Sequence, residues 1–75
     1  MLRKLSTVKA GQFVRINSFT KNDLFLKLME MGCLPGEIIS IEKIAPLGDP
    51  ISIKVSGYHL SLRLNEAETI LVEDL

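Results

Sequence analysis

The sequence predicts a mainly β domain, namely a small, partly open five-stranded barrel with one short α-helix and one or two helical turns. Three observations carry this prediction. Apolar and polar residues alternate in several short segments, turn residues separate these segments, and only one segment has the apolar spacing of a helix. With 75 residues, the chain is expected to form one domain, residues 1–75, rather than a helical bundle or a parallel α/β sheet.

The first expected elements are a helical turn and a strand. The four N-terminal residues are too few and too polar to assign. Residues 5–11 predict one helical turn, which Ser6 can cap with its side-chain oxygen. Residues 12–17 predict a strand, in which Val14 and Ile16 face the core and their alternate neighbours face outward.

One α-helix is expected over residues 23–31, because apolar residues recur there mostly at three and four positions. Thr20 or Asn22 is expected to cap its first turn. Gly32 can end the helix in a left-handed conformation, and Pro35 prevents its continuation.

The next strand is expected over residues 37–45, with a break in its alternation. Ile44 is out of phase with Ile41, so we expect a bulge near Glu42 or Lys43 that turns Ile44 toward the core.

A tight turn at Ser56-Gly57 predicts the register of the following hairpin. The pairs expected to face inward are all apolar, namely Val55 with Tyr58, Ile53 with Leu60, and Ile51 with Leu62. The pairs expected to face outward are Lys54 with His59 and Ser52 with Ser61. A slip of one residue would bury the polar set and expose the apolar one.

The C-terminal residues predict one more helical turn and a last strand. Asn65 is the expected cap of a turn over residues 65–68, and residues 69–73 follow as a strand. Glu66 and Glu68 are expected to be solvated on that turn.

Charge and composition exclude several classes of protein. Nine basic and nine acidic residues give a net charge of zero, which disfavours nucleic-acid binding. No apolar run approaches 18 residues, so neither membrane insertion nor a signal peptide is expected, and the protein is expected to be cytoplasmic. A single cysteine, Cys33, excludes an internal disulfide.

The residues with reactive side chains do not form a catalytic pattern. Cys33 follows the helix end and is expected to pack as a small apolar residue, and His59 is expected to be exposed opposite Lys54. No metal-ligand spacing or glycine-rich phosphate loop is present. We therefore expect no enzyme, no catalytic residue, no metal site and no cofactor. Coordination of ferrous iron by His59 with a nearby carboxylate stays open as an alternative.

Several motifs together resemble the ferrous iron transport protein A (FeoA) family. They are Leu28-Met29-Glu30-Met31-Gly32, Leu34-Pro35-Gly36, Ala45-Pro46-Leu47-Gly48-Asp49-Pro50 and Gly57-Tyr58-His59-Leu60-Ser61-Leu62-Arg63. The resemblance runs from Leu5 to Val72 and departs mildly at Cys33, where the family often has another apolar residue.

The resemblance implies an SH3-like barrel that acts as a small cytosolic accessory protein of bacterial ferrous iron uptake. The implied partner is the membrane transporter called ferrous iron transport protein B, which has a cytoplasmic GTP-binding domain. The same barrel occurs in iron-dependent repressors, but this chain has no DNA-binding helices, so a free-standing module is expected.

A non-enzymatic interaction protein is the leading hypothesis, docking on the cytoplasmic part of the transporter and modulating transport or its GTPase cycle. The loop from Pro46 to Pro50 is rigid and is expected to present Leu47. The residues expected to contact the partner are Leu47, Pro46, Asp49, Leu26, Met31 and Leu34.

Three further expectations accompany the docking hypothesis. The first alternative is a ferrous-iron-binding sensor or delivery protein that uses His59. The second is GTPase activation, with Arg15 or Arg63 supplying a positive charge. Exposed edge strands also permit self-association into a homo-oligomer.

Overall fold

The computed structural model describes residues 1–75 except for the side chain of Asn22. The element order is β1 (Leu2–Lys4), η1 (Leu5–Thr7), β2 (Phe13–Phe19), α1 (Asn22–Glu30), β3 (Ile38–Ile44), β4 (Ile51–Val55), β5 (Tyr58–Leu62), α2 (Leu64–Ala67) and β6 (Ile70–Asp74). All strand pairs are antiparallel. The mainly β fold class is therefore confirmed, with six strands where five were expected.

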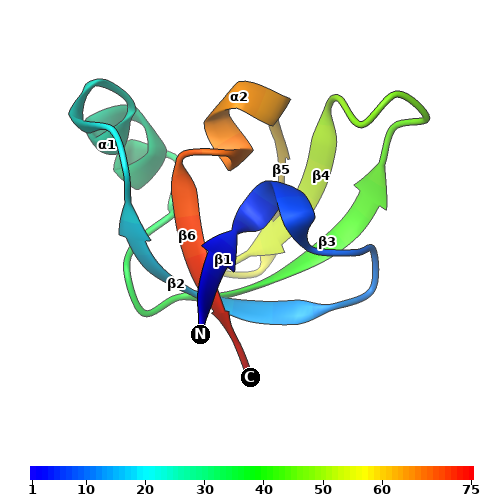
Figure 1. Cartoon of the computed structure of the whole chain (residues 1–75), viewed down its shortest axis with the longest axis horizontal. Helices are drawn as coiled ribbons and strands as arrows, with labels where there is room; N and C mark the ends of the chain where they lie inside the picture. The colour runs from blue at the N-terminus through cyan, green and yellow to red at the C-terminus, as the bar shows by residue number, and fades with distance from the viewer.

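The strands form one curved sheet in the order β1-β6-β2-β3-β4-β5, whose two edge strands are β1 and β5 (Figure 1). The sixth strand is β1, the segment that the sequence left unassigned. It pairs with β6, so that Leu2 lies opposite Glu73 and the two chain termini lie side by side (Figure 1).

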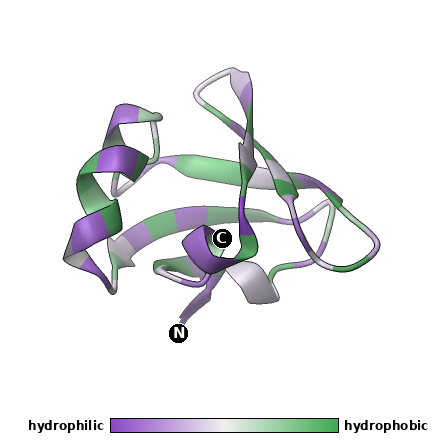
Figure 2. Ribbon diagram, turned by 90° about the horizontal axis from the view of Figure 1, so that it is seen from above, coloured by the Kyte–Doolittle hydropathy of each residue, from purple (hydrophilic) through white to green (hydrophobic). Residues whose placement is uncertain are grey.

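The core lies inside the curve of the sheet and consists of the inward residues of the strands together with residues from η1, α1 and α2. Val14 and Ile16 are buried there, as expected. Helix α1 contributes the fully buried side chain of Leu28, and Figure 2 shows the helix as alternating hydrophobic and hydrophilic bands. Such an amphipathic helix of 9 residues depends on packing for its stability.

The central strands show both the bulge and the hairpin register that the sequence predicts. The register between β3 and β4 shifts between Ile41 and Lys43, which confirms the predicted bulge. The β4–β5 hairpin has the predicted register throughout. Ser56 and Gly57 both have positive φ, 51° and 84°, as a type I′ turn requires.

One inward position of the hairpin differs from expectation. Tyr58 is 44% exposed rather than buried, because its hydroxyl group reaches past the sheet and donates a hydrogen bond to the carbonyl oxygen of Met31 at 2.9 Å. The hydroxyl end of the Tyr58 ring lies against Gly32. A Cβ atom added to Gly32 would be 2.0 Å from the Tyr58 hydroxyl oxygen. Gly32 therefore permits both the helix end and this contact.

The predicted helix caps are wrong where they can be compared. The first turn is a 3-10 helix that includes Ser6 and ends before Val8. Lys21, not Thr20, precedes α1, and the candidate cap Asn22 lies outside the described side chains. Arg63 rather than Asn65 precedes α2.

Candidate functional site

The loop between β3 and β4 displays Leu47, whose side chain is 94% exposed. Backbone hydrogen bonds close the loop, from Gly48 N to Ala45 O at 2.7 Å and from Ala45 N to Pro50 O at 3.1 Å. Asp49 Oδ1 accepts a third bond from the backbone N–H of Leu64 at 3.1 Å, which ties the loop to the start of α2. Leu47 is thus an exposed apolar side chain on a well-fixed loop.

The other predicted contact residues lie around α1. Leu26 is 65% exposed, Leu34 is 39% exposed, and Met31 is half-buried at the helix end. Figure 1 places α1 and the β3–β4 loop on opposite sides of the molecule. The predicted contact residues therefore form two separate surfaces rather than one.

Besides the packing of Leu28 in the core, three contacts hold helix α1. Lys27 Nζ lies 2.8 Å from Glu66 Oε2 on α2. Phe25 packs against Phe19 of β2 in a T-shaped arrangement, with the ring centroids 5.1 Å apart. The third contact is the Tyr58 hydrogen bond at the helix end.

Glu66 is buried rather than solvated, which corrects the expectation from the sequence. Its side chain is 6% exposed, and its Oε1 accepts a hydrogen bond from the backbone N–H of Arg63 at 2.9 Å. The hydrogen bond from Lys27 and then that from Arg63 lower the pKa of the Glu66 carboxyl group despite its burial. Glu66 therefore stays ionised near neutral pH and links α1 to α2.

Cys33 has no exposed surface. Burial first, and the charge of Glu66 second, raise the pKa of its thiol to about 11. The thiol is accordingly neutral near pH 7, which favours the packing role over a reactive one.

His59 is exposed on the outward face of β5, opposite Lys54 as predicted. Its Nδ1 contacts Glu42 Oε1, a partner that the sequence did not identify because the β3 bulge decides where Glu42 lies. Within the part of the chain that the structure describes, no three His, Cys, Asp or Glu residues gather closely enough to hold a metal ion.

The two arginines considered for charge stabilisation lie on separate elements. Arg15 Nη1 is 4.0 Å from Glu73 Oε1 on the outward face of the sheet, and both side chains are partly exposed. Arg63 is exposed at the start of α2. Neither α1 nor α2 is long and apolar enough to cross a membrane.

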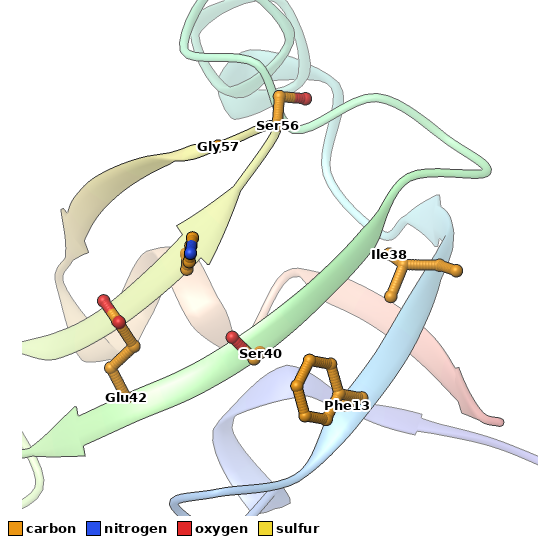
Figure 3. A pocket seen from close by; sticks show the side chains of 7 residues that line it. Phe13, Ile38, Ser40, Glu42, Ser56 and Gly57 are labelled. Atoms are coloured by element: carbon orange, nitrogen blue, oxygen red, sulfur yellow. The ribbon is translucent and has the colours of Figure 1, made fainter.

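A groove on the outward face of β2, β3 and β4 was not anticipated. We call it the outer groove; its volume is about 430 Å³, and Phe13, Ile38, Ser40, Glu42, Lys54 and the Ser56-Gly57 turn line it (Figure 3). Phe13 is 62% and Ile38 is 46% exposed. The signal was present in the sequence, because both are large apolar residues in the outward phase of their strands.

Comparison with known proteins identifies the family. The model of the FeoA domain matches residues 3–74. Over 71 residues the chain is 34% identical to an Fe(2+) transport protein A/Fe(2+) transporter FeoB fusion protein from Porphyromonas gingivalis, covering 93% of this chain and 8% of that relative. The chain thus spans only a small part of the fusion protein.

Solved structures agree with the family assignment. A FeoA-like protein from Clostridium acetobutylicum is 41% identical, with a TM-score of 0.90 over 96% of this chain and 85% of the other. The zinc complex of FeoA from Stenotrophomonas maltophilia, described as a procaryotic SH3 domain protein, is 22% identical with a TM-score of 0.81, covering 95% and 89% of the two chains. The second likeness confirms the SH3-like fold. On the family model and the relatives together, this chain belongs to the FeoA domain family.

Proposed function

We propose that this chain is a small cytosolic accessory domain of ferrous iron uptake that docks on the FeoB transporter and modulates transport or its GTPase cycle. The observation that carries the proposal is the fusion protein, in which a related domain and FeoB share one polypeptide. A covalent link raises the effective concentration of one part near the other, which benefits parts that bind each other.

The physical support is an apolar side chain held in a fixed position. The loop bonds of Ala45, Gly48 and Asp49 order the segment before a partner binds. Binding through Leu47 then costs little additional conformational entropy. We propose Leu47 as the main contact, with Pro46 and Asp49 beside it. Leu26, Met31 and Leu34 would form a second contact on the α1 side.

Association with the transporter is the direct test. Purified protein is titrated against full-length FeoB from the same organism in detergent and against its isolated cytoplasmic part. The unsubstituted chain is expected to bind, and Leu47→Ser to bind at least about tenfold more weakly, as for a central apolar contact. Lys43→Ser, exposed on the neighbouring strand, serves as the matched control. No association with either form, together with unchanged iron uptake after gene deletion, would refute the proposal.

Modulation of the GTPase cycle is measured separately. The rate of GTP hydrolysis by FeoB is compared with and without the protein, and with Arg15→Ala and Arg63→Ala. Loss of stimulation in one variant, at unchanged affinity for FeoB, would identify an arginine that acts on the nucleotide. If each variant stimulates GTP hydrolysis as much as the unsubstituted protein does, this role is excluded for both arginines.

A second candidate function is ferrous iron binding, favoured by the contact between His59 Nδ1 and Glu42 Oε1. Imidazole and carboxylate groups are suitable ligands for ferrous iron, but two protein ligands are fewer than protein metal sites ordinarily supply. Anaerobic titration calorimetry with ferrous iron tests it. Stoichiometric binding that His59→Ala abolishes would place this function first.

A further inference from the structure

The outer groove combines apolar and hydrogen-bonding surface on one face. Phe13 of β2 lies opposite Ser40 of β3, and Ile38 lies two pairs further along, opposite Arg15. Figure 3 shows Phe13, Ile38 and Ser40 close together on these two strands. Two large exposed apolar side chains at diagonal positions on neighbouring strands give the groove an apolar floor. An apolar side chain of a ligand can pack on this floor and remove its surface from water.

The groove also presents a positive charge beside this floor. Lys54 of β4 lies opposite Ser40, on the side away from Phe13. Among the side chains that the structure describes, no carboxylate lies within 4.0 Å of the Lys54 amine. The neighbouring carboxylate of Glu42 contacts His59 instead. The lining therefore has one cation available for an acidic group of a ligand.

The register of the sheet fixes the spacing between the apolar and charged positions. Phe13, Ser40 and Lys54 lie in one row across three adjacent strands. Two steps of about 4.8 Å separate Phe13 from Lys54, so the distance is about 10 Å. In a polyproline II segment, which has three residues per turn and rises about 3.1 Å per residue, residues i and i+3 lie on the same face and are separated by about the same distance. A segment crossing the strands would thus place an apolar side chain at position i and a carboxylate at position i+3.

The termini lie at the side of the groove formed by β2. Asp74 of β6 is opposite Val14, the neighbour of Phe13, and Leu2 of β1 is opposite Glu73. A polypeptide joined at either end therefore starts within a few residues of the groove. In a protein organised like the fusion relative, FeoB sequence would be tethered beside this face.

We propose that the outer groove binds a segment of the FeoB transporter in polyproline II conformation that carries a bulky apolar residue at position i and Asp or Glu at position i+3. The inference rests on the proposed function and adds a third docking surface, distinct from the Leu47 loop and from the α1 side. The apolar residue packs on Phe13 and Ile38, and the carboxylate pairs with Lys54.

The test uses the full-length protein, detergent-solubilised FeoB from the same organism, and 15-residue synthetic peptides that tile the cytoplasmic sequence of FeoB. Phe13→Thr and Lys54→Glu are each expected to weaken binding of FeoB at least about tenfold. Lys43→Glu makes the same charge change on an exposed lysine outside the groove and is expected to leave binding unchanged. Thermal unfolding checks that each variant is folded.

A charge exchange sharpens the test. The peptide that binds is expected to contain the i, i+3 pattern, and replacing its acidic residue by Lys should abolish binding to the unsubstituted protein and restore binding to Lys54→Glu.

If FeoB binds the unsubstituted chain and Leu47→Ser weakens that binding, while Phe13→Thr and Lys54→Glu bind normally, the groove inference is wrong and the proposed function stands. If FeoB binds no form of the chain, the proposed function fails first. If Phe13→Thr converts a dimer into a monomer in sedimentation experiments without affecting FeoB binding, the groove belongs to a second copy and the inference is likewise wrong.

Discussion

The β3–β4 loop and helix α1 both expose leucines, but different interactions hold them in place. The loop is closed by backbone hydrogen bonds between its own residues, and Asp49 adds one bond to Leu64 at the start of α2. Helix α1 depends on distant residues, because Leu28 packs in the core, Lys27 pairs with Glu66, and Tyr58 bonds to the helix end. The comparison indicates that substitutions elsewhere in the fold will displace α1 more easily than the loop.

The largest effect is expected from Leu28 of α1, whose side chain is fully buried. Leu28→Ala should lower the free energy of unfolding by about 2–5 kcal/mol, because it removes core contacts and leaves a cavity. Leu26→Ala on the same helix is the control and should change it by less than about 0.5 kcal/mol. Urea unfolding measures both. If Leu28→Ala and Leu26→Ala lower the free energy of unfolding equally, α1 is not anchored through Leu28.

The next effect concerns the helix end. Gly32→Ala should cost about 2–3 kcal/mol, because Gly32 has a φ of 97° and an added Cβ would displace the Tyr58 hydroxyl group. Gly36→Ala, at a φ of 93° with no heavy atom within 4 Å of the added Cβ, should cost only about 1 kcal/mol. Calorimetry measures the loss of stability in both variants, and the difference between them gives the contribution of the Tyr58 contact. Equal losses of stability would rule out such a contribution.

The ion pair of α1 predicts a dependence on pH. The pKa of Glu66 is lower in the folded protein than in the unfolded chain, so its stabilisation is present above the unfolded pKa and is lost as the pH falls through the folded one. Lys27→Met should cost about 1–2 kcal/mol at pH 7, a modest value because Lys27 is largely exposed.

Urea unfolding from pH 7 to pH 3 tests this prediction. The difference between Lys27→Met and the unsubstituted protein should shrink as Glu66 becomes protonated. Lys43→Met, at an exposed lysine, should show no such trend. A constant difference over the whole range would contradict the role assigned to Glu66.

The smallest effect is expected in the loop. Asp49→Ala removes the acceptor for the Leu64 N–H and should cost about 0.5–1 kcal/mol, whereas Asp49→Asn retains an acceptor and should cost less. Hydrogen exchange of the Leu64 amide, measured by NMR, should accelerate in the first variant only. If Asp49→Ala also accelerates exchange across α1, the two regions are coupled, contrary to the comparison above.

Local patterns in the sequence predicted the parts of the fold that depend on neighbouring residues. The β4–β5 register follows from alternation on both sides of one tight turn, and the β3 bulge follows from the phase of Ile44. Strand β1 was not predictable in this way, because three residues carry no clear alternation and their partner β6 lies at the other end of the chain.

The site residues show the same limit. Leu47 was correctly expected to be exposed, since a rigid turn has few ways to bury its apex. The burial of Glu66 depends on Lys27, 39 residues away, and the position of Tyr58 depends on a carbonyl group of the helix end, 27 residues away. The outer groove required knowing that Phe13 and Lys54 lie in one row across β3.

The pairing of β1 with β6 has a consequence for how such a domain can be combined with others. Paired residues of adjacent strands have Cα atoms only about 5 Å apart, so a host protein would have to bridge a very short gap to receive this domain within one of its surface loops. Attachment at one end only is equally compatible with the fold. A compact unit whose ends meet can thus be moved between polypeptides, as a separate chain, a terminal extension or an insertion, without rearrangement of its core.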